Sequence, residues 1–134
     1  MYLLDTNILS ELMKRQPNSQ LLSRLGSEPA YTLFTSCICI MELRFGSALR
    51  KDFNRFWQKI TKEIISRVNI LPIDKKEVLV AGDILAGLRK TGQIIGLEDV
   101  LIAASAITNQ YTVVTANIRH FSRISNLRVE NWLE

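Results

Sequence analysis

The sequence predicts an α/β fold with a mainly parallel central sheet and helices on both of its faces. Short apolar runs alternate with stretches of helical periodicity along the whole chain, an interval typical of βαβ units. Residues 112–115, TVVT, form a continuously apolar run bounded by threonines. The chain has 134 residues, 47% of them hydrophobic, and no Pro-, Gly- or Ser-rich stretch, so we expect one domain over residues 1–134.

Five segments have the composition of strands. Residues 2–4 are apolar, and residues 31–36, YTLFTS, have the aromatic and β-branched content that strands favour. We expect strands at residues 2–4, 31–36, 68–73, 112–115 and 127–129.

Between these segments the apolar residues recur at helical spacing. One short helix opens at Pro17 and runs to Leu25, with Gly26 in the position of a terminating glycine. Asp74 caps a longer helix that runs to Thr91. We expect helices at residues 6–14, 17–25, 38–49, 52–66, 74–91 and 97–109.

The two cysteines and the amino-terminal residues indicate the cellular compartment that we expect. Cys37 and Cys39 are too few and too close for a disulfide framework, and a lone CxC lacks the partners of a closed zinc site. Asp5 interrupts the apolar start, so no signal peptide is predicted, and no stretch is long enough to span a membrane. We therefore expect a cytoplasmic protein with buried, reduced thiols.

The net charge of +4 is unevenly distributed. Four of the 13 acidic residues are assigned below to one pocket, and the rest are outnumbered by 17 basic residues. A basic surface around an acidic pocket can bind a polyanion, while the pocket itself binds cations.

Asp5 ends the first strand in the stretch MYLLDTNILS. A carboxylate at this position lies at the carboxyl edge of a parallel sheet, where open α/β folds bind their ligands. Thr115, Ala116 and Asn117 follow the strand 112–115 just as Asp5 and its neighbours follow the first strand. We expect both segments to emerge at the same edge.

Two acids on separate helices add to Asp5. Glu42 is the one charge on the otherwise apolar face of its helix, and Asp99 stands in the first turn above an apolar stripe. An acid in a first turn also complements the helix dipole without any function, and this second interpretation applies most strongly to Glu98, which would reach a metal only through water. Three crowded carboxylates would repel one another unless a cation neutralised them. Oxygen ligands without a cysteine cluster favour Mg²⁺ or Mn²⁺, which can activate water against a phosphodiester.

Four segments together resemble the PIN domain, and in particular the VapC toxins of bacterial toxin–antitoxin pairs. They are MYLLDTNILSEL, CIMELRFG, GLEDVLIAASA and VVTANIRHFSRISNLRVENW, and the similarity extends from Met1 to Trp132. The resemblance implies a three-layer α/β/α fold with a parallel sheet and a Mg²⁺-dependent endoribonuclease. It assigns the acidic pocket to Asp5, Glu42 and Asp99.

The resemblance also implies polar supports for the pocket, at Thr6, Asn7 and Thr115. The fourth acidic position of many relatives falls on Asn117, which carries no charge, so a second ion would be held more weakly. In a related pattern the acid lies three residues after the position of Asn117, where this chain has His120. We interpret His120 as a surface residue packed beside Phe121. The alternative is that it contacts the phosphate or transfers a proton.

Toxins of this family imply two protein contacts, with a VapB-like antitoxin and with a second copy of the chain. Phe53, Phe56 and Trp57 form an aromatic stripe that is more often core than interface at helical spacing. Relatives cut initiator tRNA, other tRNAs or ribosomal RNA, and the sequence does not choose among these substrates.

Candidate RNA contacts are three arginines, because guanidinium groups match phosphates in a planar, bidentate way. Arg44 is close in sequence to Glu42, while Arg119 and Arg123 follow Asn117. Such contacts position a substrate without identifying it.

Two other classes of protein remain open at this point. A receiver domain also binds Mg²⁺ on a parallel sheet, but it has two adjacent acids after its first strand, where this chain has Asp5 alone, and Asp74 is better explained as a helix cap. A catalytically weak module that binds RNA or antitoxin is favoured by Asn117.

Overall fold

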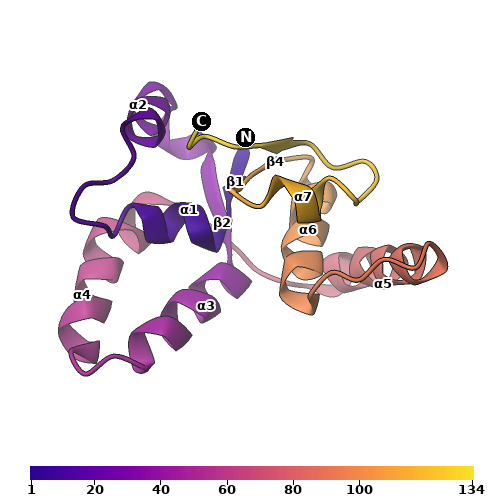
Figure 1. Ribbon diagram of the computed structural model, residues 1–134, viewed down its shortest axis with the longest axis horizontal. Helices are drawn as coiled ribbons and strands as arrows, with labels where there is room; N and C mark the ends of the chain where they lie inside the picture. The colour runs from indigo at the N-terminus through magenta and orange to yellow at the C-terminus, as the bar shows by residue number, and fades with distance from the viewer.

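The computed structural model describes residues 1–134 and is built on a five-stranded sheet in which every neighbouring pair of strands is parallel (Figure 1). The strands are β1 (Tyr2–Leu4), β2 (Leu33–Ser36), β3 (Asn69–Leu71), β4 (Thr112–Val114) and β5 (Val129–Glu130), in the order β3-β2-β1-β4-β5. The predicted α/β fold with a parallel central sheet is confirmed.

The central strand is β1, which pairs with β2 on one side and with β4 on the other. Leu3 and Leu4 have no solvent exposure, and neither do Val113 and Val114 of β4, which lie beside them in register. Burial of these aliphatic side chains on both sides of the strands explains why the runs are apolar without alternation. Asp5 follows Leu4 directly, so the first polar residue after the buried strand lies at its carboxyl end.

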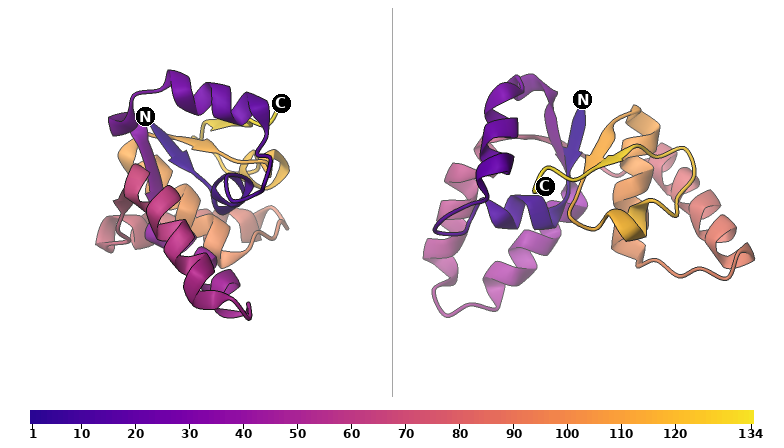
Figure 2. Two further views of the ribbon diagram at one scale, coloured as in Figure 1. Left: turned by 90° about the vertical axis from the view of Figure 1, so that its left-hand side faces the viewer. Right: turned by 45° about the horizontal axis from the view of Figure 1, so that its top comes forward.

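Seven helices surround the sheet. Figure 1 shows α1 to α4 on one side of the central strands and α5 to α7 on the other, and the right-hand view of Figure 2 shows the same division. They are α1 (Thr6–Glu11), α2 (Ser19–Ser27), α3 (Cys37–Ala48), α4 (Phe53–Glu63), α5 (Lys75–Lys90), α6 (Leu97–Asn109) and α7 (Ile118–Phe121). No helix combines the length and the apolar character that a membrane span requires.

The first two helices differ from the expected bounds, for local reasons. After Glu11 the hydrogen bonds of residues 12–14 run to the third preceding residue instead of the fourth, so α1 tightens and ends three residues early. Asn18 caps α2 by accepting a hydrogen bond from the Leu21 backbone, so the helix begins at Ser19 rather than at Pro17. Gly26 lies inside α2, and the prediction that it terminates this helix is wrong.

Several other bounds are shorter than expected. The strand expected at 31–36 begins only at Leu33, after a 3-10 turn over Ala30–Thr32, and the helix expected at 52–66 ends at Glu63 before another such turn. The last strand lies at Val129–Glu130, two residues later than expected, and the short α7 was not predicted. None of these differences moves a carboxylate of the predicted pocket.

Candidate active site

A pocket of about 540 Å³ lies at the carboxyl edge of β1 and β4. It is lined by the end of β1, by the exposed side of α1, by one residue each from α3 and α6, and by the segment that follows β4. The lining residues are Asp5, Thr6, Asn7, Ser10, Glu11, Lys14, Glu42, Asp99, Ala116, Asn117 and Leu133. The structure therefore brings together the three carboxylates and the asparagine that the sequence analysis singled out.

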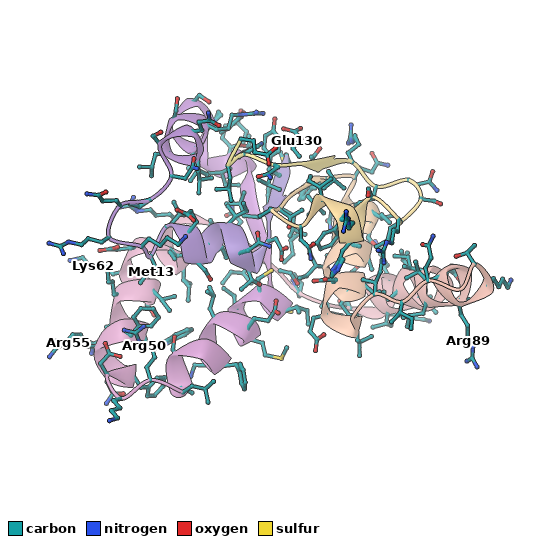
Figure 3. The ribbon with its side chains drawn as sticks, viewed as in Figure 1. Met13, Arg50, Arg55, Lys62, Arg89 and Glu130 are labelled. Carbon is teal, nitrogen blue, oxygen red and sulfur yellow. The ribbon has the colours of Figure 1, made fainter.

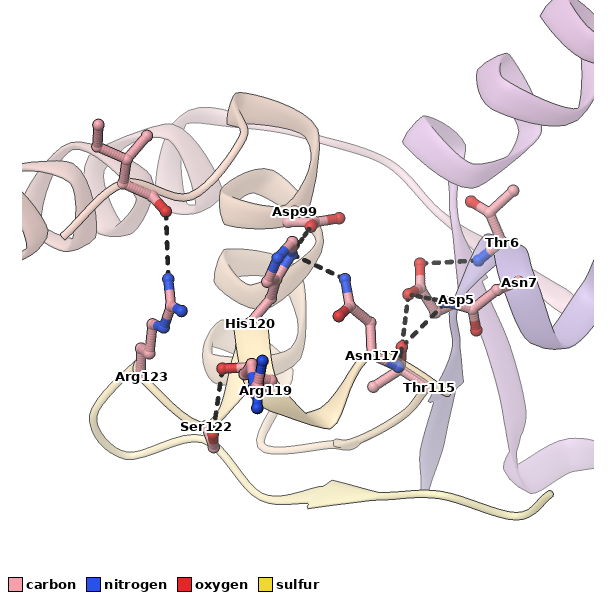
Figure 4. A network of polar contacts seen from close by, with 11 residues as sticks. Asp5, Thr6, Asn7, Asp99, Thr115, Asn117, Arg119, His120, Ser122 and Arg123 are labelled. Carbon is pink, nitrogen blue, oxygen red and sulfur yellow. Dashed lines mark hydrogen bonds and ion pairs between the residues drawn. The ribbon is translucent and has the colours of Figure 1, made fainter. Parts of the chain in front are cut away.

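Asp5 is the most deeply placed of these carboxylates, with 4% of its surface exposed. It caps α1, because its Oδ1 accepts a hydrogen bond from the Thr6 backbone N–H at 2.8 Å. Its Oδ2 accepts a second hydrogen bond, also of 2.8 Å, from the Thr115 hydroxyl (Figure 4). Its own backbone N–H donates to the Val114 carbonyl and continues the pairing of β1 with β4. Backbone and side chain are thus both held before any ligand binds.

Thr115 and Asn7 join the ends of the two central strands. The Thr115 hydroxyl donates to Asp5 and accepts from the backbone N–H of Asn117 at 2.9 Å. The Asn7 amide donates to Asp5 and to Thr115, each at 3.3 Å, and its carbonyl oxygen accepts from the backbone N–H of Ala116 at 3.1 Å. These contacts fix the direction in which the Asp5 carboxylate faces.

Glu42 enters the pocket from α3 and is held by α1. The Thr6 hydroxyl donates to its Oε1 at 2.6 Å, a short distance typical of a hydrogen bond to a charged oxygen. The apolar residues that share its side of the helix are not buried as a face: Phe45 and Leu49 are 67% and 73% exposed. Glu42 therefore stands where α3 leaves the core, between the strand end and a solvent-exposed apolar stripe.

Asp99 enters from the first turn of α6 on the opposite side of the pocket. Its carboxylate has one side-chain partner, the Nδ1 of His120, at 3.3 Å, and 24% of its side chain is exposed. The same Nδ1 lies 2.8 Å from the side-chain nitrogen of Asn117 (Figure 4). The expectation that His120 is only a surface residue packed beside Phe121 is wrong in this respect, because α7 turns its ring against Asp99.

Crowding and burial raise the pKa of Asp5. The largest cause is its removal from water, and the negative charges of Asp99 and Glu42 add to the effect, while hydrogen bonds from Thr115 and Thr6 oppose it. A bound cation would remove this penalty by neutralising the charges.

One thiol lies beside the acids. Ligand atoms of Asp5, Glu42 and Cys39 all lie within 4.8 Å of one another, so a divalent ion fits the two carboxylates at this point. Burial, helped by the charge of Asp5, raises the pKa of Cys39 to about 11, so at neutral pH this cysteine is a protonated thiol rather than a metal-binding thiolate. Cys37 is only partly buried, and both cysteines are free.

Other candidate residues lie outside the pocket. Glu98 is exposed and does not line it. Arg44 also does not line it, because its guanidinium lies over the rings of Phe53 and Trp57, at 4.4 and 4.9 Å from their centroids. The expectation that Arg44 lies close to the pocket is therefore wrong, since residues two apart on a helix face different directions.

The two later arginines lie on the Asp99 side of the molecule. Arg119 is exposed on α7, and Arg123 donates a long hydrogen bond of 3.5 Å to the Ile94 carbonyl (Figure 4). Asp74, the residue that a receiver domain would phosphorylate, caps α5 in a reciprocal arrangement with Glu77 and does not line the acidic pocket. The fold thus gives the receiver interpretation no support.

Sequence analysis missed four residues that line the pocket, the polar residues Ser10, Glu11 and Lys14 and the apolar Leu133. Ser10 and Lys14 had a signal in the sequence, because they follow Thr6 at intervals of four and so fall on one side of the helix expected over residues 6–14. Lys14 pairs with Glu11 at 2.9 Å and places one positive charge at the rim of an acidic pocket.

Comparison with known proteins agrees with this geometry. The family model of the PIN domain matches residues 2–127. The chain belongs to the PIN-domain family. Ribonuclease VapC2 of Haemophilus influenzae is 36% identical to this PIN domain over 132 residues, which cover 98% of each chain. The tRNA(fMet)-specific endonuclease VapC of Salmonella typhimurium is 31% identical over 138 residues, covering 98% of this chain and 97% of the relative.

Solved structures match the fold of this PIN domain closely. One is the crystal structure of VapBC2 from Rickettsia felis bound to a DNA fragment from its promoter, with a TM-score of 0.89, 34% identity and coverage of 98% of each chain. Nucleases of the PIN family generally require a divalent metal ion, and the acidic group at Asp5 and Glu42 is consistent with that requirement.

Proposed function

We propose that this chain, acting as one PIN domain over residues 1–134, is the toxin of a toxin–antitoxin pair and a Mg²⁺-dependent endoribonuclease. The observation that carries the proposal is that Asp5, Glu42 and Asp99, from β1, α3 and α6, line one pocket. Relatives that cover nearly the whole chain are named ribonucleases and an endonuclease, which supports the same reaction class.

Asp5, Glu42 and Asp99 are the groups that would hold Mg²⁺, with Mn²⁺ as an alternative, because all three offer hard oxygen ligands. When bound, the ion would supply an activated water and would offset charge on the phosphodiester. The protein's part is to present the ligands: Thr115 and the Thr6 backbone orient Asp5, and the Thr6 hydroxyl orients Glu42.

Asn117 and His120 complete the Asp99 side. Asn117 lines the pocket and contacts His120, which in turn contacts Asp99. We propose that Asn117 orients water or phosphate. An acid at this position would instead help to hold a second ion. His120 holds Asp99 toward the pocket in the state whose Nδ1 carries a proton, because only then can this nitrogen donate to the carboxylate.

The substrate we propose is RNA, with tRNA as the first class to test because the Salmonella relative is named for tRNA(fMet). Arg119 and Arg123 are exposed beside the Asp99 side and can contact phosphates next to the cleaved bond. Arg44 would contact RNA only at a distance from the pocket. An RNA substrate and two free thiols both fit the cytoplasm.

An antitoxin and a second copy of the chain are the proposed protein partners. Solved relatives are VapBC complexes, which supports a VapB-like antitoxin for this chain. Phe53, Phe56 and Trp57 are half-buried under arginine side chains, so they are not the exposed surface that a homodimer needs. Met41 and Phe45 on α3 and Leu49 at its C-cap are exposed one turn apart, and we propose that the homodimer covers them.

The experiment that tests the nuclease uses the purified chain, freed of antitoxin, and total cellular RNA with and without Mg²⁺ or Mn²⁺. We expect metal-dependent cuts at few sites, abolished by Asp99→Asn. Asp83→Asn removes an exposed carboxylate on α5 and serves as the matched control. Cleavage that survives both chelation and Asp99→Asn contradicts the mechanism.

The alternative is a PIN domain that binds RNA or antitoxin and cleaves weakly or not at all. The presence of Asn117 at a pocket position where many relatives carry an acid favours it. Tight RNA binding without any cleavage at saturating Mg²⁺ or Mn²⁺ would establish this alternative.

A further inference from the structure

Three cations lie close together on one side of α4, and Glu63 lies at the edge of the same side. Arg55, Lys59 and Lys62 are exposed, and at 100° per residue they fall within an arc of about 60°. The apolar residues Ile60 and Ile64 point the opposite way and are buried in the core. We refer to Arg55, Lys59 and Lys62 as the α4 ridge.

No residue of the α4 ridge forms an ion pair. The ion pairs of the molecule join Lys14 to Glu11, Arg24 to Glu28 and Glu130, Arg50 to Asp52 and His120 to Asp99, so no ridge residue has a carboxylate within 4.0 Å. Glu63 lies one turn after Lys59 but makes no ion pair with it, so the acid–base pairing that stabilises many solvated helix faces is missing here. Three unpaired cations on one arc instead produce a positive field.

Two further basic residues, Lys14 and Arg15, follow α1, and Lys14 is paired with Glu11. Lys62 shares a groove with Leu12, which follows the end of α1, and Lys14, two residues later, lines the acidic pocket. Arg15 is exposed in the same loop and has no ion pair. The six residues of α1 span only about 9 Å. Figure 3 shows Arg55 and Lys62 on the outer side of α4.

The chemistry of the α4 ridge favours a phosphate backbone over a protein surface. Protein interfaces are centred on apolar or aromatic anchors that become buried. No large hydrophobic residue of α4 is exposed, although such residues are exposed on α3, α5 and the loop before α6. Cations on flexible stems without an anchor suit a polyanion, which they neutralise while releasing counterions.

We propose that the α4 ridge binds the backbone of the RNA substrate away from the bond that is cut, with the strand passing along α1 into the acidic pocket. The proposal rests on the proposed function and adds the path of the substrate. It predicts that the protein prefers an RNA long enough to reach both the pocket and α4.

The test measures RNA binding in the Asp99→Asn background, so that cleavage does not interfere. The ridge variant carries Arg55→Gln, Lys59→Gln and Lys62→Gln together. The probe is a fluorescein-labelled single-stranded oligoribonucleotide, and its anisotropy is followed against protein concentration at several salt concentrations.

A matched control removes three cations elsewhere. Lys75→Gln, Lys76→Gln and Arg89→Gln change the net charge equally on α5, and Figure 3 shows Arg89 at the opposite end of the molecule. We expect the ridge variant to bind on the order of tenfold more weakly, with a salt slope smaller by about 2, because each lost phosphate contact removes about 0.7. The control should change both quantities much less.

Equal affinity and equal salt slope for the ridge and control variants would overturn the proposal. So would a ridge variant that binds RNA normally but no longer copurifies with its antitoxin, because the α4 ridge would then be a protein contact. Thermal unfolding of both variants, and each single substitution, separates a folding defect from lost binding. If the unaltered chain does not cleave RNA but the ridge variant loses RNA binding, the α4 ridge is supported and the nuclease proposal is contradicted. Failure of the ridge proposal can therefore be distinguished from failure of the proposed function.

Discussion

The two sides of the acidic pocket are built differently. On the strand side, Asp5 is 4% exposed and accepts hydrogen bonds from the Thr6 backbone and the Thr115 hydroxyl. On the helix side, the Asp99 side chain is 24% exposed and contacts His120 alone. Half of the site is therefore fixed by the fold, whereas the other half is free to adjust to a ligand. Because Asp5 is already held in place and Asp99 can move its side chain, this small domain can bind a cation without a rearrangement of its core.

Among substitutions that leave the three carboxylates in place, removal of the Thr115 hydroxyl should have the largest effect, because it disturbs the fixed side. Thr115→Val leaves Asp5, Asn7 and the Asn117 backbone without a shared partner. We expect RNA cleavage to fall by about 100-fold, the upper end for groups that orient a metal ligand. Single-turnover cleavage rates at saturating Mg²⁺ measure this effect. Thr108→Val removes a hydroxyl that bonds only within α6 and should leave the rate unchanged.

An added carboxylate on the adjustable side should strengthen metal binding. Asn117→Asp places a fourth acid in the pocket, and we expect Mn²⁺ to bind about tenfold more tightly, since an additional hard, charged ligand favours the ion. Isothermal titration calorimetry gives the dissociation constant directly. Asn126→Asp changes the charge equally outside the pocket. Unchanged affinity in Asn117→Asp would mean that this position does not reach the ion.

Replacement of His120 should have a smaller effect, because Asp99 is accessible without it. His120→Phe removes the side-chain partner of Asp99, and we expect Mn²⁺ affinity to fall about threefold, within the range for a half-exposed contact. His120→Asn retains a polar group near the same position and should restore most of the affinity. If both variants bind the ion like the unaltered chain, His120 does not position Asp99.

The buried carboxylate on the strand side should also appear in the pH dependence of stability. The pKa of Asp5 is raised, so without metal the folded state binds more protons than the unfolded state between the two pKa values. Its contribution to the free energy of unfolding is present below its ordinary pKa of 3.8 and is lost as pH rises through the raised value. Urea unfolding in a chelator at several pH values should show this decline, which Asp5→Asn should reduce. Added Mg²⁺ should stabilise the unaltered chain near neutral pH and not the variant.

Sequence reasoning anticipated the parallel sheet and the positions of the acids along it. Asp5 could be placed because it follows an apolar run, and the ends of parallel strands meet at one edge. Asp99 could be placed on the pocket-facing side of its helix because its apolar neighbours are buried, whereas those of Glu42 are mostly exposed and gave its helix no such direction. Helix ends were less predictable, since Gly26 lies within a helix that Asn18 had already shifted along the chain.

The contacts of His120 and Arg44 could not be predicted from local pattern. The interpretation of His120 as a surface residue ignored α7, a helix of four residues that is too short to give a periodic signal. Arg44 is two residues from Glu42 in the chain, yet it lies over aromatic rings that α4 supplies. Both outcomes depend on how elements far apart in sequence pack together.

By itself, the sequence determined which segments become buried strands and which acids follow them, because hydrophobic burial and strand direction act on neighbouring residues. The tertiary structure alone decided how strongly each acid is held. That difference arises because the partners of Asp5 and Asp99 are 110 and 21 residues away, and only folding sets the distances between them.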